Sequence, residues 1–421
     1  MAVTTTTVAE ACAAAKSAAR ELARASAEQK NLALEATARL LEERTAGILE
    51  ANAADLADER ATGLTEALRD RLALSEDRVA AMAAGVRVVA ALDDPVGEEL
   101  ERKTLASGLD LRKVRVPLGV VAVVYEARPN VTIDCAALTI KSGNAIVLRG
   151  SSYAERSNGA LAAIVREALA EAGLPEDAVL LLGSGGREDL AELATQERSV
   201  DLLIPRGGEG LKAAIKDVAT VPVMYAAAGN CHVYAHAEAD LEMARRIAVN
   251  AKTQRPGVCN AAETLLIDAA IAERFAPAVL ADLAEAGVEL VGDERVRSLA
   301  GDVDVGAASA ADWDSEYLEL KIAVAVVDSV EDAVEHINRH GTGHSEAIVT
   351  GDEEAAEEFA AGVDAAAVYV NASTRFTDGF EYGMGAEIGN STQKLHARGP
   401  IGMRELTTFK YVARGDGQIR E

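Results

Sequence analysis

The order of apolar and polar positions predicts a helical first segment followed by a hairpin. From residue 8 to about residue 92, apolar residues recur at intervals of three and four, as in Leu34, Ala38 and Leu41, which is the period of a helix with one buried face. Residues 100–105 and 109–116 then alternate between apolar and polar positions, and Pro117 follows. This alternation predicts a solvated antiparallel pair of strands.

From residue 120 onward, short continuous apolar runs alternate with helical patterns. The expected strands are residues 120–125, 145–148, 178–182, 200–204 and 222–225, and then 263–267, 288–291, 322–327, 347–350 and 366–370; the expected helices are residues 133–140, 154–172, 209–217, 241–250, 270–286 and 330–339. Strands that are apolar throughout indicate parallel sheets covered on both faces. The sequence therefore predicts an α/β protein with two lobes, and a tail from residue 376 that ends in a strand at residues 408–413.

Composition and charge narrow the kinds of partner. A chain of 421 residues exceeds the usual size of one hydrophobic core, which agrees with two lobes. Its 42 basic and 68 acidic residues give a net charge of −26, which repels a nucleic-acid backbone. We therefore expect no nucleic-acid partner, and any anionic ligand must be bound by local cations.

The cysteines indicate a reducing compartment. There are four, with no CxxC pair, too few for a disulfide framework in a chain of this length. The first 30 residues lack a cationic start followed by an apolar core, and no window approaches the roughly 20 apolar residues of a membrane span. We expect a cytoplasmic protein that is not embedded in a membrane.

Cys259 is the candidate for chemistry. It lies between a helical pattern and an expected strand, after Pro256 and Gly257, where a turn could present a thiol; a nucleophile and an inert small apolar residue are both compatible with that position. Cys12 and Cys135 fall in expected helices and are interpreted as packing residues. Cys231 precedes His232, but adjacent residues of a strand face opposite ways and cannot form a dyad.

Other motifs are weaker. No glycine-rich segment has the form of a P-loop or of GxGxxG after a strand, which disfavours an ordinary Rossmann dehydrogenase. The segment PRGG at residues 205–208 joins an expected strand to a helix, where an anion could bind. Residues 393–400 form a cationic segment, either a salt-bridged loop or an anion clamp. His336, His340 and His344 are spaced by four, but Gly341 and Gly343 break the helix, and no metal site is expected.

Several segments together resemble the γ-glutamyl phosphate reductase (glutamate-5-semialdehyde dehydrogenase) family. They are YEARPNVT at residues 125–132, KSGNA at 141–145, PRGG at 205–208, AKTQRPGVCNAAET at 251–264, GAEIG at 385–389 and KLHARGP at 394–400. The segments occur in the order and at the spacing of that family, and together they span nearly the whole chain. The resemblance implies the fold of the wider aldehyde dehydrogenase superfamily, with two Rossmann-like α/β domains and a small β oligomerisation element, which would also account for the missing GxGxxG.

The resemblance further implies domain boundaries and partners. Expected are a cofactor domain at residues 1–118 and 137–232, a catalytic domain at 233–365, an oligomerisation element with the tail at 119–136 and 378–421, and a return to the cofactor domain at 366–377. A homo-oligomer follows, and glutamate 5-kinase is a candidate partner because it makes the labile substrate.

The implied reaction is the NADPH-dependent reduction of L-glutamyl 5-phosphate to L-glutamate 5-semialdehyde and phosphate, the second step of proline biosynthesis. Cys259 would form a thioester, which hydride from NADPH reduces. The resemblance also assigns an oxyanion donor (Asn130), cofactor ligands (Arg149, Ser151, Pro205, Arg206, Gly207, Gly208 and Glu316) and substrate ligands (Arg375, His396 and Arg398).

The segment before Cys259 bears on the fate of the thioester. Hydrolytic aldehyde dehydrogenases carry a glutamate base upstream of the cysteine, and the corresponding segment here, YAAAG at residues 225–229, has no carboxylate. Without a base to activate water, phosphate is the expected partner of the thioester. The alternatives are a hydrolytic NAD(P)-dependent aldehyde dehydrogenase, a silent binding or scaffold protein of the same fold, and a cysteine hydrolase, for which no His/Asn order is evident.

Overall fold

The computed structural model describes residues 7–183 and 185–420 and divides the chain into two compact units. Unit 1 contains Met1–Ala226, Gly383–Gly389 and Ile401–Glu421, and unit 2 contains Ala227–Tyr382 and Asn390–Pro400. Each unit is built around its own parallel sheet. The predicted α/β class with two lobes is confirmed.

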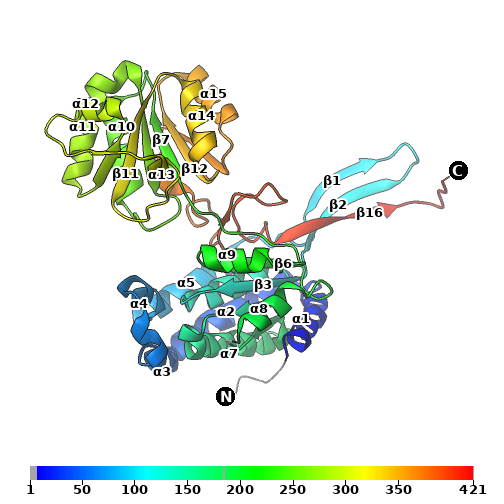
Figure 1. Ribbon diagram of the computed structural model, residues 1–421. Helices are drawn as coiled ribbons and strands as arrows, with labels where there is room; N and C mark the ends of the chain where they lie inside the picture. The colour runs from blue at the N-terminus through cyan, green and yellow to red at the C-terminus, as the bar shows by residue number, and fades with distance from the viewer. Residues whose placement is uncertain (1–6, 184, 421) are drawn as a thin grey trace. The chain divides into compact units, whose positions relative to one another are not determined.

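Unit 1 begins with five helices, as the apolar periodicity predicts (Figure 1). They are α1 (Val8–Leu22), α2 (Ala27–Glu43), α3 (Thr45–Leu56), α4 (Glu66–Leu72) and α5 (Glu76–Ala91). Thr7 and Ser26 start α1 and α2 with capping boxes, in which the cap side chain and the third helical residue satisfy each other's free amides. Helix α2 packs against α5 and against α7 (Glu155–Glu171), a helix of the sheet domain, which places the helical layer on that domain.

The sheet of unit 1 has four parallel strands in the order β5-β4-β3-β6. The strands are β3 (Val120–Tyr125), β4 (Ala145–Arg149), β5 (Val179–Leu181) and β6 (Leu202–Arg206), and the helices are α6 (Asn130–Lys141), α7 (Glu155–Glu171), α8 (Arg187–Ala194) and α9 (Glu209–Lys216). The prediction of a strand at residues 222–225 is wrong. Val223 makes only a single bridge to Leu203, because Pro222 has no N–H to continue a ladder.

A three-stranded antiparallel sheet completes unit 1. It consists of β1 (Glu99–Thr104), β2 (Asp110–Pro117) and β16 (Thr407–Arg414), and all of β1 is exposed. The predicted hairpin is thus confirmed, and the strand of the tail pairs with β2 of the same chain. The domain assignment stays a prediction, although residues 120–125, grouped there with the oligomerisation element, form β3 inside the four-stranded sheet.

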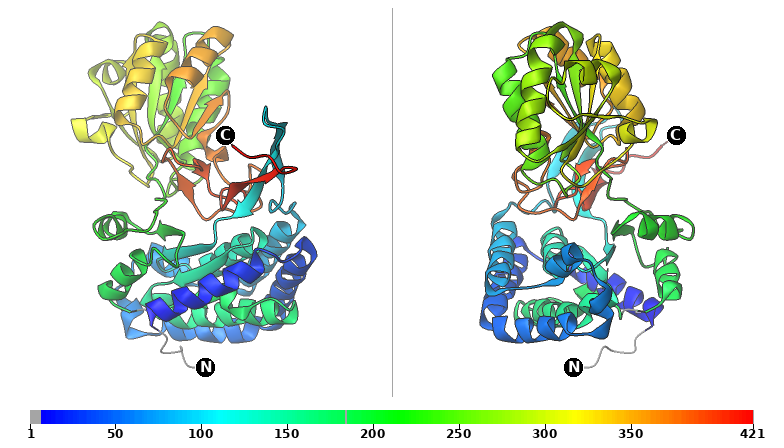
Figure 2. Two further views of the ribbon diagram at one scale, coloured as in Figure 1. Left: turned by 90° about the vertical axis from the view of Figure 1, so that its right-hand side faces the viewer. Right: turned by 60° about the vertical axis from the view of Figure 1, so that its left-hand side comes forward.

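Unit 2 contains a parallel sheet with helices packed against it (Figures 1 and 2). The sheet has seven strands in the order β10-β9-β11-β8-β7-β12-β13. Its strands are β7 (Cys231–Ala235), β8 (Ala262–Asp268), β9 (Glu289–Gly292), β10 (Gly306–Ala307), β11 (Lys321–Val327), β12 (Ser345–Val349) and β13 (Ala367–Val370). Its helices are α10 (Leu241–Thr253), α11 (Ala269–Glu285), α12 (Glu294–Leu299), α13 (Ala310–Trp313), α14 (Val330–His340) and α15 (Glu353–Gly362). A short pair, β14 (Asn390–Ser391) and β15 (Gly399–Pro400), also belongs to it.

Alternation along the central strands of unit 2 produces two cores. Val233 and Leu265 face a cluster with α10 and α11, whereas their neighbours Tyr234 and Leu266 face a cluster with α14 and α15. Figure 1 shows the two sets of helices on opposite sides of the sheet. Because β7 pairs in parallel with β8 and β12, the amino ends of these three strands lie side by side at one end of the sheet. Cys259 lies just before β8 at that end.

Candidate active site

Cys259 is presented by a tight turn between α10 and β8. The amide of Ala261 donates to the carbonyl of Val258 at 3.1 Å, so Cys259 and Asn260 are the central residues of a β-turn. Cys259 is partly exposed, while Cys12, Cys135 and Cys231 are buried. A partly exposed thiol on a fixed turn meets the first requirement of a nucleophile.

Asn260 fastens this turn to the 3₁₀ helix η4 (Thr374–Phe376). Its side-chain amide donates to the carbonyls of Arg375, at 3.3 Å, and Thr377, at 3.0 Å. In return, the hydroxyl of Thr374 donates to the carbonyl of Asn260 at 2.7 Å. The thiol therefore sits on backbone that is held by three hydrogen bonds from a segment more than a hundred residues away.

The YAAAG segment ends directly against Cys259. A Cβ atom added at Gly229 would lie 1.4 Å from the carbonyl oxygen of Cys259 and 2.7 Å from its Cα, so only glycine fits. Cys231 donates its thiol to the same carbonyl at 3.1 Å. Burial raises the pKa of Cys231 well above its usual value, which keeps this second sulfur a neutral thiol and leaves Cys259 as the candidate nucleophile.

Arg375 is brought to the Cys259 turn, as a substrate ligand would need to be. Its Nε donates to the side-chain oxygen of Gln254 at 2.9 Å. Burial lowers the pKa of Arg375 and nearby Arg255 lowers it further, while Asp378 and, to a smaller extent, Cys259 and Cys231 raise it. A guanidinium group close to Cys259 can hold an anionic substrate there.

Glu316 also lies at this turn. Its Oε1 accepts the amide of Gly229 at 2.7 Å, and Gly229 packs on Cys259. The residue predicted to bind the nicotinamide ribose and the predicted nucleophile thus contact the same glycine. The sequence contains no periodic signal for this proximity, because β8 and the segment before β11 are brought together only by the order of strands in the sheet.

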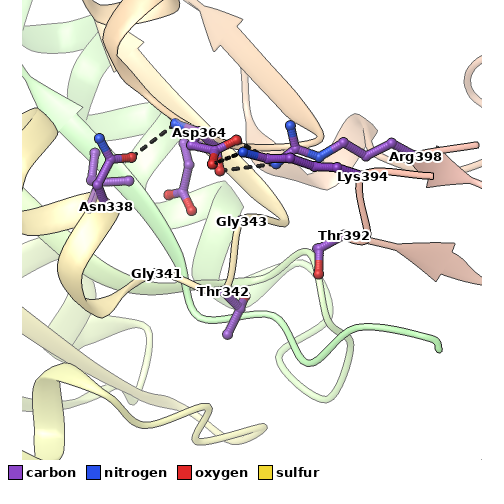
Figure 3. Close-up of a pocket in the computed structure, with 10 residues that line it drawn as sticks. Asn338, Gly341, Thr342, Gly343, Asp364, Thr392, Lys394 and Arg398 are labelled. Atoms are coloured by element: carbon purple, nitrogen blue, oxygen red, sulfur yellow. Dashed lines mark hydrogen bonds and ion pairs between the residues drawn. The ribbon is translucent and has the colours of Figure 1, made fainter.

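The other two predicted substrate ligands lie elsewhere in unit 2. Arg398 donates to the carboxylate of Asp364 at 2.9 Å and, with Lys394, which also pairs with Asp364, lines a pocket of about 460 Å³ (Figure 3). His396 is exposed. In the structure, Lys394 and Arg398 therefore form a salt-bridged loop, one of the two interpretations of the cationic segment. Binding of substrate by His396 and Arg398 stays a prediction.

Glu346 is a pocket residue that sequence reasoning missed. It is fully buried in β12, where its Oε2 accepts a hydrogen bond from the backbone amide of His232 at 2.6 Å. The same oxygen lies 2.9 Å from Nδ1 of the His232 imidazole ring. Burial raises the pKa of Glu346 well above its usual value. A carboxylic acid directly before the apolar run of residues 347–349 is the signal that could have found it.

The predicted cofactor ligands of unit 1 gather at the carboxyl edge of its sheet. Tyr125, the last residue of β3, pairs with Arg206, and Val124 pairs with Arg149. Ligands of open parallel sheets bind at this edge. Gly208 caps α9 without a side-chain hydrogen bond, and a Cβ there would meet nothing within 4 Å, so the helix start has room for an anionic group.

Arg149 and Arg206 are held by neighbouring backbone. Arg149 donates to the carbonyls of Gly185, at 2.6 Å, and Gly186, at 2.9 Å, and burial lowers its pKa. The guanidinium of Arg206 packs on Gly389, where an added Cβ would lie 2.8 Å from Nη1. These contacts orient the two guanidinium groups, as a dinucleotide phosphate site would require.

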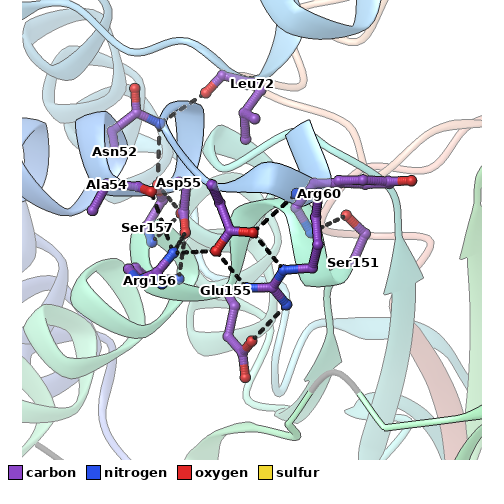
Figure 4. Close-up of polar contacts among 11 residues, drawn as sticks. Asn52, Ala54, Asp55, Arg60, Leu72, Ser151, Glu155, Arg156 and Ser157 are labelled. Atoms are coloured by element: carbon purple, nitrogen blue, oxygen red, sulfur yellow. Dashed lines mark hydrogen bonds and ion pairs between the residues drawn. The ribbon is translucent and has the colours of Figure 1, made fainter. Parts of the chain in front are cut away.

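Ser151 follows β4 and lies beside a cluster of charges at the start of α7 (Figure 4). Its hydroxyl accepts the amide of Tyr153 at 3.3 Å. Arg60, in the 3₁₀ helix η1 (Glu59–Gly63), pairs with Asp58 and Glu155, and η1 contacts the 3₁₀ helix that Ser151 precedes. Arg60 is thus a cation near Ser151 that no sequence pattern indicated.

Asn130 begins α6 in unit 1, and its side-chain amide donates to Asp134 at 3.0 Å. Its role as oxyanion donor stays a prediction. Within residues 7–183 and 185–420, no three His, Cys, Asp or Glu side chains are grouped so as to hold a metal ion. None of the helices in this described part of the chain is long and apolar enough to cross a membrane.

Comparison with known proteins identifies the class. Residues 1–312 and 322–412 match the model of the aldehyde dehydrogenase family, so the chain belongs to that family, whose members use a nicotinamide cofactor. It is 55% identical to the γ-glutamyl phosphate reductase of Moorella thermoacetica over 97% of both chains, and 54% identical to that of Syntrophomonas wolfei over 96% of both. The crystal structure of γ-glutamyl phosphate reductase from Thermotoga maritima superimposes with a TM-score of 0.95 at 46% identity, covering 98% of this chain and 100% of that one. Within the aldehyde dehydrogenase family, the chain is thus a member of the γ-glutamyl phosphate reductases.

Proposed function

We propose that this protein reduces L-glutamyl 5-phosphate to L-glutamate 5-semialdehyde and phosphate, with NADPH as reductant, in the second step of proline biosynthesis. The observation that carries the proposal is the Cys259 turn: Cys259 is partly exposed, its backbone packs on Gly229, and the Arg375 guanidinium is close to it. The identity of more than 50% to γ-glutamyl phosphate reductases over nearly the full length supports the substrate.

In the proposed mechanism the Cys259 thiolate attacks the acyl phosphate carbonyl. A carbon–sulfur bond forms, the carbon–oxygen bond to phosphate breaks, and phosphate leaves with the electron pair. NADPH, when bound, supplies the hydride that reduces this thioester. The resulting thiohemiacetal collapses to the aldehyde and returns the thiolate to Cys259.

Arg375 is proposed to hold an anionic group of the substrate close to Cys259, since its guanidinium lies at the same turn. His396 and Arg398 are proposed as further ligands of the carboxylate or phosphoryl group. Arg398 would then exchange its bond with Asp364 for one to the substrate. Asn130 is proposed to stabilise the oxyanion of the tetrahedral intermediate.

The cofactor assignment to NADPH is part of the proposal. Arg149 ends β4 and Ser151 follows it at the carboxyl edge of the sheet, where a 2′-phosphate could be received. Residues 205–208 are proposed to contact the dinucleotide, and Glu316 to bind the nicotinamide ribose. The predicted domain boundaries, a homo-oligomer, a cytoplasmic location and association with glutamate 5-kinase complete the proposal.

The thioester is proposed to exchange with phosphate in preference to water. Residues 225–229 supply no carboxylate, and a side chain at Gly229 is excluded by the backbone of Cys259. Water near the thioester therefore lacks the general base that hydrolytic relatives provide from this segment.

Phosphate dependence in the oxidative direction tests the proposal. Purified protein is given glutamate semialdehyde and NADP, and NADPH formation is followed with and without phosphate or arsenate. We expect steady turnover only when one of these anions is present. Equal turnover in a phosphate-free buffer would instead assign the protein to the hydrolytic aldehyde dehydrogenases, and absence of turnover under all conditions would favour a binding protein.

A further inference from the structure

A buried ion pair joins the two ends of the segment that carries Cys259. Lys252 is the last residue but one of α10, and Glu263 is the second residue of β8. Their side chains meet at 2.5 Å, and both are 0% exposed. The ten residues between them include the whole Cys259 turn, so the ion pair closes the base of this loop.

This pair is costly for folding. Burial raises the pKa of Glu263 to about 7 even though Lys252 lowers it, and burial lowers the pKa of Lys252. Both shifts show that the folded protein disfavours the charged forms. A buried ion pair is often no more stable than apolar residues of the same shape, so stability alone does not account for two charges at this position.

The second oxygen of Glu263 reaches another turn. Its Oε1 accepts the amide of Leu318 at 3.4 Å, a long hydrogen bond, and Leu318 has φ of 57°, in the left-handed region that an L-residue adopts at some cost. Glu316, two residues earlier, accepts the amide of Gly229 at 2.7 Å. The turn at residues 316–318 is therefore held at one end by Glu263 and at the other by Gly229.

Gly229 completes a closed circuit of contacts. It packs against the backbone of Cys259, which lies in the loop that Lys252 and Glu263 close. The circuit runs from Cys259 through Gly229 and Glu316 to Glu263, and back to Cys259 along β8. Displacement of either turn breaks at least one of these contacts.

We propose that the Lys252–Glu263 ion pair is a positioning device that locks the turn carrying Cys259 to the turn carrying Glu316. Its importance for the reaction rests on the proposed function, which gives Cys259 and Glu316 their roles. The two groups then keep one mutual arrangement whether or not ligands are bound. Lys252 and Glu263 themselves touch neither substrate nor cofactor in this scheme.

The test is the double variant Lys252→Met/Glu263→Met, which removes both charges and the oxygen that accepts from Leu318, and keeps side chains of similar size. Because no buried charge is left unpaired, we expect a melting temperature equal to or above that of the wild type. Hydrogen exchange of the backbone amides at residues 227–231 and 315–319 should become about tenfold faster, and kcat should fall about tenfold or more. The single variant Lys252→Met should melt at a lower temperature, since it strands the Glu263 carboxyl.

A matched control is Arg295→Met/Asp328→Asn, which removes an ion pair of 2.8 Å in the same unit whose Asp328 side chain is 69% exposed. We expect it to change neither the exchange at the two turns nor kcat. Unchanged exchange in the buried-pair variant would overturn the proposal, and so would faster exchange with wild-type kcat. The exchange measurement needs no substrate. If the wild-type protein were inactive, the proposed function would be refuted, and the exchange rates would still show whether the ion pair holds the two turns together.

If the double variant does not fold, Glu263→Asp replaces it. This variant keeps a negative charge near Lys252 and withdraws the acceptor from Leu318 by one methylene. Faster exchange at residues 315–319 is again expected, and exchange at the wild-type rate would overturn the proposal.

Discussion

Replacement of Gly229 by alanine is expected to displace the nucleophile. The added Cβ would lie 1.4 Å from the carbonyl oxygen and 2.3 Å from the carbonyl carbon of Cys259. Restoring an ordinary contact of about 3.2 Å requires a movement of about 1.8 Å, larger than the displacement of about 1 Å that can cost an enzyme 100-fold. We expect kcat/KM to fall at least about 100-fold and the free energy of unfolding to fall by about 1–3 kcal/mol.

The assay compares steady-state reduction with the melting temperature and with NADPH binding measured by fluorescence. Gly257→Ala is the matched control, because it lies on the same loop and its added Cβ would come only within 3.6 Å of the carbonyl of Leu318. That variant should retain activity within about threefold. Wild-type kcat in Gly229→Ala would refute the argument that the Gly229 contact sets the position of Cys259.

Three further outcomes are expected. Cys259→Ser should abolish turnover and leave NADPH binding intact in a fluorescence titration; residual turnover would remove the thiol from the mechanism. Arg149→Ala should raise the KM for NADPH about tenfold and that for NADH less than twofold, as initial rates with each cofactor will show. Burial lowers the pKa of His344 to about 4, so the folded protein keeps this ring neutral while the unfolded chain protonates it below about pH 6.5. The free energy of unfolding should therefore fall by about 2 kcal/mol between about pH 7 and about pH 5 because of His344, and this contribution is retained in full above about pH 6.5. Urea unfolding of His344→Gln should show a smaller fall between the two pH values. An equal fall would contradict this linkage.

The apolar periodicity predicted most of the fold because burial decides most of these elements. Continuous runs such as residues 120–125 and 322–327 became strands buried on both faces, and the alternating residues 109–116 became a solvated strand. The strand prediction for residues 222–225 was wrong because it considered only their apolar character. It did not take into account that Pro222 has no N–H to donate to a neighbouring strand. Helices as short as α12 and α13 carry too little periodicity to be found in this way.

The candidate site was predictable only in part. Cys259 could be selected because it stands at a turn before a buried strand, a local pattern. The contact of Gly229 with Cys259 and the ion pair of Lys252 with Glu263 depend on how β7 and β8 are paired, which no local pattern states. Arg398 was expected beside the substrate. Its pairing with Asp364 arises because residues 394–398 return to unit 2, and no pattern in the sequence shows where this segment lies.

The central claim is that Cys259 carries a glutamyl thioester that is discharged by phosphate. The most direct measurement mixes the protein with glutamate semialdehyde and NADP in phosphate-free buffer, counts the NADPH formed in the first turnover, and locates the adduct by mass spectrometry. The account predicts a burst of one NADPH per chain, a glutamyl adduct on Cys259 that persists, and its rapid loss when phosphate is added. An adduct on another residue, or one that decays equally fast without phosphate, would contradict it.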